Sequence, residues 1–498
     1  MKRKRTIVLA AALCMVMSVA APLASFAEET EMDVSSVQEG EISEVAAEPV
    51  AGVTIYVQGY EWGPGVPKVI LEFEREVSEV SASDLTIQTA GMERTVRAVY
   101  PSDANGNSAD GASRYVTIEM ETTNEVSGSP FTYDLSVLMN KWSESYPVVV
   151  TSEDFVIDGE SRSLSVNEDC INSRICPDTD RFNYRGSYTG TYRNNYTGQD
   201  EQITLRTAAY EPTSLAGGEQ NPLVIWVHGQ GEGGTDVEIE LIGNEVVALA
   251  RDEIQSYFTA GDQTGAYVLA VQCETYWMDE GDGTNGLGSG VSRYTEALMD
   301  AIQDYVAKNT DVDPNRIYLG GCSNGGYMTI NMLVNYPDYF AAAYANCAAY
   351  SYYEYTRNED GSYAGERTDS RWVDEETVEK LKEIPIWFIL SIDDQVVDPT
   401  LYELPTYRAL VQAGAENCWL SVFESIEGTD SPGTTYIGHY AWVYALNNQV
   451  TGIQNVAAVA ASTDTVAFGT TPTNQGGGTE TANGYNNLFA WLNAQSKG

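Results

Sequence analysis

A glycine-rich turn between an expected strand and an expected helix constrains this chain more than any other stretch. Residues 316–328 read Arg-Ile-Tyr-Leu-Gly-Gly-Cys-Ser-Asn-Gly-Gly-Tyr-Met. The apolar run 317–320 predicts a buried strand, and the residues after the turn predict a helix that ends near Tyr336, before Pro337. The turn has the nucleophile-elbow pattern Gly-x-Ser-x-Gly, in which Ser323 lies at the apex of a strained turn. Glycine on both sides lets strand and helix pass closely.

The scarcity of histidine selects a partner for this serine. A serine hydroxyl is a poor nucleophile unless a base takes its proton, and the base needs an orienting acid. In proteins with this elbow, the acid and then the histidine follow the serine along the chain. The chain has only His228 and His439, and only His439 follows Ser323, in a loop beyond the last expected strand. The sequence therefore predicts Ser323 as nucleophile and His439 as base.

The orienting acid is expected in the loop after the apolar strand 386–390. That loop contains three aspartates, Asp393, Asp394 and Asp398, and the order of the elements alone does not choose among them. Asp398 precedes a proline, which favours a cap or turn role for its side chain.

Acyl transfer also needs two backbone N–H groups aimed at the oxyanion. Asn324, directly after the nucleophile, is one expected donor. The second is expected in the loop 228–234, His-Gly-Gln-Gly-Glu-Gly-Gly, where we choose Gln230. His228 at the start of this loop is expected to be a structural hydrogen-bonding residue. A phosphate-binding loop is excluded because no Lys-Ser/Thr follows the glycines.

Two patterns of hydrophobic residues divide the chain. Residues 51–160 show short alternating runs separated by turn residues and no helical period, which predicts an immunoglobulin-like β-sandwich. Residues 161–180 are polar and are expected to form a connector. In residues 181–498, continuous apolar strands alternate with helices, which predicts a mostly parallel sheet covered on both faces. Within it, residues 237–251 are expected to be one helix, and residues 449–484 an insertion.

The N-terminal residues predict export. A basic start and an apolar run precede Ser-Phe-Ala, so residues 1–27 read as a signal peptide cleaved after Ala27, and the protein is expected to be secreted. Residues 28–50 are acidic and read as a disordered linker. No other apolar stretch is long enough for a bilayer, so no stable membrane insertion is expected after cleavage.

Removing the four basic residues of the signal lowers the net charge from −45 to −49, which disfavours nucleic acid as a partner.

Cysteines and histidines give little support for a metal site. With two histidines and no Cys-x-x-Cys pair, neither a metal nor a cofactor is expected. Cys170 and Cys176 lie close together in the polar connector, where a local disulfide is compatible with an oxidising compartment.

Four ordered motifs carry a family resemblance. They are the Trp-Val-His-Gly-Gln-Gly-Glu-Gly-Gly segment from Trp226, the elbow segment from Val312, the Pro-Ile-Trp-Phe-Ile-Leu-Ser-Ile-Asp-Asp-Gln-Val-Val segment from Pro385, and Gly-His-Tyr-Ala-Trp from Gly438. Together they resemble secreted α/β-hydrolase esterases of the group related to predicted peptidases, polyhydroxybutyrate depolymerases and feruloyl esterases. Residues 51–157 are similar to the immunoglobulin-like domain that precedes some of these esterases.

The resemblance narrows the site. Asp394 is similar to the Asp of the Asp-x-x-Val segment that carries the acid in many such esterases, which favours it over Asp393. Tyr276 and Trp277 follow the strand expected to end at Val271 and are expected to line an aromatic or sugar-accepting cleft, and with Trp442 they are the expected substrate-binding residues. The alternative is that surface aromatic residues here support loops.

These inferences predict a serine carboxylic-ester hydrolase with an acyl-enzyme intermediate, acting on small-molecule or polysaccharide-linked esters such as feruloyl or acetyl esters. Two alternatives stay open. The same triad also serves a serine peptidase, because the motifs do not separate ester from amide chemistry. A polysaccharide-binding protein on an inactive hydrolase scaffold is the other alternative.

Overall fold

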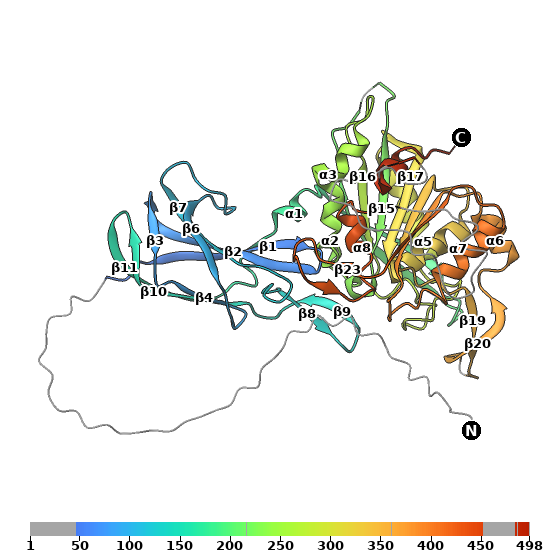
Figure 1. The fold of residues 1–498 in the computed structure, drawn as a ribbon, viewed down its shortest axis with the longest axis horizontal. Coiled ribbons are helices and arrows are strands. Elements are labelled where there is room, and N and C mark those ends of the chain that lie inside the picture. The colour runs from blue at the N-terminus through green and yellow to red at the C-terminus, as the bar shows by residue number, and fades with distance from the viewer. Residues whose placement is uncertain (1–45, 216, 360, 452–483, 486, 498) are drawn as a thin grey trace, which may run out of the picture.

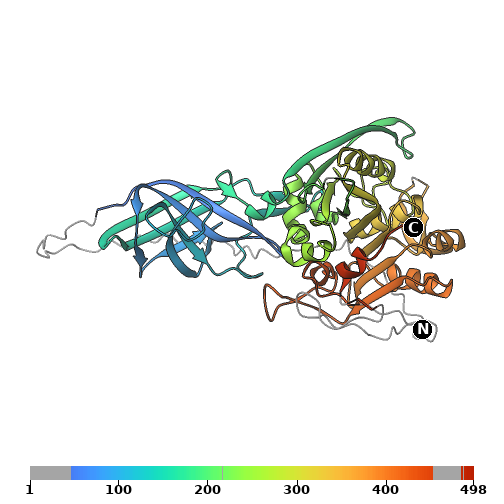
Figure 2. The same cartoon turned by 90° about the horizontal axis from the view of Figure 1, so that it is seen from above.

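The computed structural model describes residues 46–215, 217–359, 361–451, 484–485 and 487–497. These residues form an elongated β-domain and a larger α/β domain, which lie side by side along the long axis of the molecule (Figures 1 and 2). The signal peptide, most of the expected linker and most of the expected insertion at 449–484 fall outside the described residues. Within the described ranges, no helix has the length and apolar character needed to cross a bilayer.

The β-domain consists of two main sheets. One has the strand order β12-β1-β2-β7-β6, and the other has the order β11-β10-β4-β5, with β3 also paired to β10. Burial alternates along β1, so that Val53, Ile55 and Val57 point into the core, as the hydrophobic alternation predicts. The strands are β1 (Val50–Tyr60), β2 (Gly63–Val77), β3 (Val80–Ala82), β4 (Thr86–Thr89), β5 (Met92–Glu93), β6 (Val96–Ser102), β7 (Ser113–Met120), β10 (Pro147–Ile157), β11 (Glu160–Asp169) and β12 (Arg174–Ile175), and a separate hairpin comprises β8 (Phe131–Asp134) and β9 (Met139–Trp142).

The expected connector at 161–180 is wrong for residues 161–169. These residues form most of β11, which pairs antiparallel with β10 along its length. Only Leu164 and Val166 of this strand are buried, because β11 lies at the edge of its sheet and most of its side chains face solvent. An edge strand with so many polar residues lacks the hydrophobic alternation from which strands are predicted. Beyond it, Cys170 and Cys176 are both free thiols.

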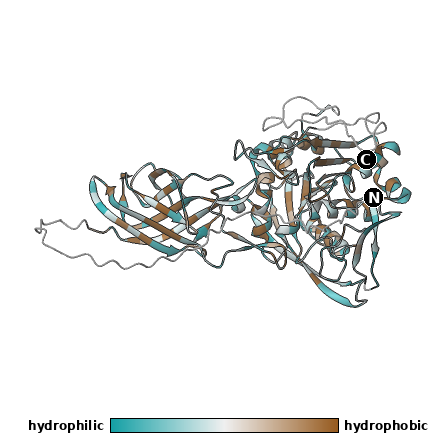
Figure 3. Ribbon diagram, turned by 60° about the horizontal axis from the view of Figure 1, so that its bottom comes forward, coloured by the Kyte–Doolittle hydropathy of each residue, from teal (hydrophilic) through white to brown (hydrophobic). Residues whose placement is uncertain are grey.

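The α/β domain is built on one eight-stranded sheet with the order β13-β14-β16-β15-β17-β18-β21-β22. The strands from β16 to β22 in this order are parallel, and β13 and β14 are antiparallel additions at one edge. The parallel strands β15, β16, β18, β21 and β22 are fully buried, and so is β17 from Ile317 onward, as expected for a sheet covered on both faces (Figure 3). The eight strands of the sheet are β13 (Tyr184–Arg193), β14 (Asp200–Tyr210), β15 (Asn221–Val227), β16 (Tyr267–Gln272), β17 (Val312–Cys322), β18 (Ala342–Asn346), β21 (Ile386–Ser391) and β22 (Cys418–Phe423).

Short helices and hairpins complete this domain. The helix expected at 237–251 is broken, because α2 ends at Gly243 and Glu245 adopts φ 59° before a 3₁₀ segment. The helices are α1 (Pro177–Asp180), α2 (Val237–Gly243), α3 (Asp252–Gln255), α4 (Thr295–Lys308), α5 (Asn324–Asn335), α6 (Glu375–Leu381), α7 (Glu403–Gln412), α8 (Trp442–Leu446) and α10 (Leu488–Asn493), with 3₁₀ segments η1 (Gln230–Glu232), η2 (Val246–Ala250) and η3 (Ser256–Phe258) and the paired strands β19 (Tyr353–Arg357), β20 (Tyr363–Arg371), β23 (Ile426–Glu427) and β24 (Thr435–Tyr436).

The register of the parallel strands positions the candidate site. Val227 pairs with Gly321, and Cys322 with Asn346, so the ends of β15, β17 and β18 lie level with one another. In a parallel sheet the loops after such strands meet at one edge, which is where open α/β sheets bind ligands.

Candidate active site

The elbow has the geometry that its sequence predicts. Ser323 lies between β17 and α5 with φ 55° and ψ −113°, and it is partly exposed between buried neighbours. The glycines on both sides are required by close packing. A Cβ at Gly321 would lie 2.5 Å from the carbonyl oxygen of Val227, and one at Gly325 would collide with the same atom. The backbone strain at Ser323 is therefore held by the tight crossing of β15, β17 and α5.

Asp394 and His439 meet at the same edge of the sheet. His439 Nδ1 lies 2.8 Å from Asp394 Oδ2, and both side chains are about 1% exposed. The other carboxylate oxygen of Asp394 accepts the backbone N–H groups of Val396 at 2.8 Å and Val397 at 2.9 Å. The carboxylate thus fixes the orientation of the imidazole, and Nε2 is left as the nitrogen that can exchange a proton.

The other two aspartates of the acid loop have different contacts. Asp393 accepts a hydrogen bond from the Ser391 hydroxyl at 2.8 Å. Asp398 closes a turn by accepting the backbone N–H of Thr400 at 2.9 Å, which is the turn role expected for it. Of the three candidates, Asp394 is the one that contacts the histidine. Gly438 permits this contact, since a Cβ there would lie 2.7 Å from the backbone nitrogen of Asp394.

The end of β18 links the histidine pair to the elbow. The Ser323 N–H donates to the Asn346 carbonyl at 2.9 Å, and the Ala349 N–H donates to the Ser323 carbonyl at 3.1 Å. Between them lies Cys347, which has φ 41° and whose sulfur lies within 4.8 Å of ligand atoms of Asp394 and His439. Serine, histidine and aspartate therefore gather around one strand end.

Cys347, Asp394 and His439 also form the one group of three potential metal ligands found in the part of the chain that the structure describes. The Asp394 carboxylate there already interacts with two backbone N–H groups and with His439. With the carboxylate engaged in this way, the arrangement suits proton transfer better than metal binding.

The two expected oxyanion donors occupy equivalent positions. Gln230 is the first residue of η1, and Asn324 is the first residue of α5. The first N–H groups of a helix have no intrahelical acceptor, so both are available to a ligand.

His228 holds the loop that carries Gln230. Its Nε2 accepts the backbone N–H of Cys273 at 3.1 Å, so its Nδ1 carries the proton and donates to the Gly229 carbonyl at 2.5 Å. Complete burial lowers the pKa of His228 to about 4, which keeps the ring neutral. These contacts agree with the structural role expected for His228.

The three aromatic residues expected to bind substrate have separate surroundings. Trp277 is fully buried with its ring centroid 5.1 Å from that of His228, so the expectation that it lines an open cleft is wrong. Its position after a strand suggested exposure, but its ring packs in the core. Tyr276 is 7% exposed, and its hydroxyl donates to the Val137 carbonyl of the β8–β9 hairpin, so it joins the two domains. Trp442 packs edge-on against His439, with centroids 5.7 Å apart.

Sequence reasoning missed two residues near the site. Cys347 directly follows β18, and this position at the carboxyl edge of the sheet could have singled it out. Asn285 lies in a long glycine-rich loop, yet its side chain contacts both Gln230 and Asn324. No motif marks Asn285.

Comparisons with known proteins agree with this architecture. Residues 52–161 match the esterase Ig-like N-terminal domain, and residues 293–386 match the prolyl oligopeptidase family. Over 67 residues the chain is 37% identical to Poly(3-hydroxyalkanoate) depolymerase C of Paucimonas lemoignei, and that alignment spans 14% of this chain and 15% of that protein.

Solved structures are similar over longer stretches. The crystal structure of a thermostable esterase is similar over 80% of this chain and 97% of its own, with a TM-score of 0.59 and 21% identity. A ferulic acid esterase is similar over 53% of this chain and 94% of its own, with a TM-score of 0.35 and 19% identity. At such identity the first likeness shows the fold. The expected α/β-hydrolase fold behind an immunoglobulin-like domain is confirmed.

Proposed function

We propose that this chain, a serine hydrolase of the α/β-hydrolase fold behind an esterase immunoglobulin-like domain, cleaves carboxylic esters through a covalent acyl-enzyme on Ser323. The observation that carries the proposal is the 2.8 Å contact between Asp394 and His439 at the strand end that also binds the backbone of Ser323.

The first half of the reaction forms the acyl-enzyme. His439 Nε2 takes the proton of the Ser323 hydroxyl while Oγ attacks the ester carbonyl carbon. The carbonyl oxygen becomes an oxyanion, to which the backbone N–H groups of Gln230 and Asn324 donate. When the intermediate collapses, the alcohol leaves with the proton held by His439, and the acyl group stays on Ser323.

The second half repeats these steps with water. His439 takes a proton from water, the hydroxide attacks the acyl carbonyl, and Ser323 leaves with the proton as the acid is released. Throughout, Asp394 stabilises the imidazolium and holds Nδ1–H toward itself.

The substrates that we propose are feruloyl or acetyl esters of polysaccharides. An exported enzyme would meet such polymers, and the signal-like residues 1–27 motivate export with cleavage after Ala27. The similarity to a poly(3-hydroxyalkanoate) depolymerase makes polyester bonds a second class to test.

A peptidase is the second candidate function. It is favoured by one observation, namely that the elbow lies within residues 293–386, the segment that matches the prolyl oligopeptidase family. Rates on one acyl group presented as an ester and as an anilide would separate the two, and faster cleavage of the anilide would favour the peptidase.

The test of the proposed function is hydrolysis of a short-chain nitrophenyl ester. Ser323→Ala is expected to lower kcat/KM by at least about 10³-fold, because it removes the nucleophile and leaves the oxyanion donors. The control is Ser370→Ala, an exposed serine in β20. Both variants should keep the Tm of the wild type. Activity retained in Ser323→Ala would refute the assignment of the nucleophile.

A further inference from the structure

A single side-chain amide joins the two residues assigned to the oxyanion hole. Asn285 Nδ2 donates to Gln230 Oε1 at 2.5 Å, and Asn285 Oδ1 accepts from Asn324 Nδ2 at 2.9 Å. On the other side, Asn324 Oδ1 accepts the backbone N–H of Met278 at 3.2 Å. The amides of Gln230, Asn285 and Asn324 therefore form one continuous chain of hydrogen bonds, although they come from three separate segments.

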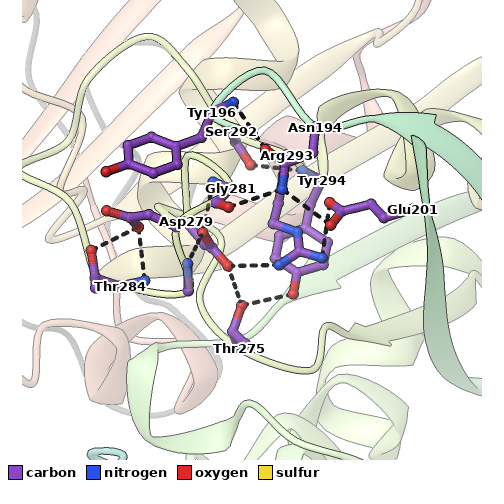
Figure 4. A network of polar contacts seen from close by, with 12 residues as sticks. Asn194, Tyr196, Glu201, Thr275, Asp279, Gly281, Thr284, Ser292, Arg293 and Tyr294 are labelled. Atoms are coloured by element: carbon purple, nitrogen blue, oxygen red, sulfur yellow. Dashed lines mark hydrogen bonds and ion pairs between the residues drawn. The ribbon is translucent and has the colours of Figure 1, made fainter. Parts of the chain in front are cut away.

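The loop that presents Asn285 is held rigidly from within. Its anchor is Asp279, which is fully buried. One carboxylate oxygen accepts the backbone N–H groups of Gly281 at 2.7 Å and Gly283 at 3.0 Å. The other accepts the Thr275 hydroxyl at 2.8 Å and the Arg293 guanidinium at 3.2 Å (Figure 4). Such a network stabilises one loop conformation.

The far end of the loop is tied to the elbow. The Ser351 N–H donates to the Gly288 carbonyl at 2.9 Å, and a Cβ at Gly288 would collide with the Ala349 carbonyl. Ala349 itself donates to the carbonyl of Ser323. Asn285 is thus presented by a loop that is anchored at Asp279 and tied at Gly288 to the segment that follows Cys347.

We propose that Asn285 is a positioning residue that sets the spacing of the two oxyanion donors, an inference that rests on the proposed function. The donors lie on η1 and α5, which follow different strands, β15 and β17. Oxyanion stabilisation depends on donors whose positions are fixed before the charge develops. The amide bridge fixes one donor segment to the other, and it contacts side chains only, so it leaves both backbone N–H groups free for the oxyanion.

The first experiment measures kcat, KM and Tm of Asn285→Ala on a short-chain nitrophenyl ester. We expect kcat to fall about 10- to 100-fold, less than for complete loss of a donor, with KM and Tm near those of the wild type. The matched control is Thr284→Ala, in the same loop, whose exposed side chain donates a hydrogen bond to Asp282 at 2.8 Å. It should behave as the wild type.

A second measurement separates positioning from loop stability. A trifluoromethyl ketone forms a tetrahedral adduct whose oxyanion occupies the hole. Its affinity should fall in Asn285→Ala by the same factor as kcat. Loss of kcat with unchanged affinity for this ketone would overturn the inference.

Gln230→Ala breaks the bridge from its other end and keeps the backbone N–H. It carries the test if Asn285→Ala does not fold. In the double variant Gln230→Ala/Asn285→Ala, the loss of kcat should be no larger than in either single variant, because both substitutions remove the same hydrogen bond. Additive losses would overturn the bridge.

A wild type without turnover would instead contradict the proposed function, whereas equal activity of the wild type and Asn285→Ala would contradict only this inference.

Discussion

The two sides of the proposed site are attached to the immunoglobulin-like domain in different ways. On the acid–base side, Glu61, from the turn between β1 and β2, is 1% exposed and inserts into the loop that precedes His439. Its carboxylate accepts hydrogen bonds from Thr429 N at 2.8 Å, Asp430 N at 3.0 Å, Tyr436 Oη at 2.8 Å and Asn447 Nδ2 at 2.7 Å.

On the oxyanion side the attachment is spread over single hydrogen bonds to the β8–β9 hairpin. Asn140 donates to the Glu232 carboxylate at 3.2 Å, Trp142 Nε1 donates to Asp236 at 2.8 Å, and the Tyr276 hydroxyl donates to the Val137 carbonyl. Gln230 and Asn324 themselves are held from within their own domain, by Asn285. The histidine loop depends on a residue from the other domain. The immunoglobulin-like domain should therefore affect proton transfer more than oxyanion binding.

The largest expected effect tests the acid–base side itself. Asp394→Asn should lower kcat/KM by about 10³- to 10⁴-fold, because an amide cannot stabilise the imidazolium and can favour the wrong tautomer. The measurement is ester hydrolysis across pH. The control is Asp393→Asn, which alters a neighbour that contacts Ser391 and not the histidine. A larger loss in Asp393→Asn than in Asp394→Asn would reverse the assignment of the acid.

A smaller effect tests the attachment to the other domain. Glu61→Ala leaves four donors without their acceptor, and each buried unpaired group costs about 1–3 kcal/mol unless water or a shift of the loop replaces the bond. We expect kcat to fall about 10-fold as the histidine loop loosens, together with a lower Tm. The experiment should also measure the affinity of the trifluoromethyl ketone, whose oxyanion occupies the proposed oxyanion hole.

Two readouts decide this comparison. Affinity for the ketone should change less than kcat in Glu61→Ala, since Gln230 and Asn324 keep their supports. Glu427→Gln is the control, because Glu427 is exposed in the same loop region and its carboxylate accepts the nearby hydroxyls of Ser425 and Thr435. Wild-type kinetics in Glu61→Ala would show that the histidine loop does not need the other domain.

The same contrast explains what could be predicted from sequence. Ser323, His439 and the position of the acid loop follow from local patterns and from the order of strands, which a single chain reveals. Glu61 and Asn285 carry no such signal. Glu61 lies 369 residues from Asp430, and only tertiary packing brings them together. The burial of Trp277 is not predictable either, because the sequence places this aromatic residue near a strand end but does not show whether its ring faces the core.

The smallest expected effect concerns stability on the oxyanion side. Burial raises the pKa of Glu232 to about 7 and raises that of Glu240 well above its usual value. A carboxyl whose pKa is raised on folding contributes stability below its unfolded pKa of about 4.5, and that stability is lost as pH rises through the folded pKa. The contribution of these two carboxyls to stability should therefore fall as pH rises above about 4.5.

Glu240→Gln isolates one of these groups. Glu240 is fully buried in α2, and among the described residues no side chain donates to its carboxylate. At pH 5 the wild-type carboxyl and the amide are both neutral, so the two Tm values should agree. At pH 9 we expect the variant to melt about 2–4 °C higher, because it avoids ionisation of a buried group. Glu253→Gln, an exposed site in α3, should show no such pH-dependent difference. Lower stability of Glu240→Gln than of the wild type at pH 9 would contradict this prediction. It would mean that a hydrogen-bond donor compensates the buried charge of Glu240.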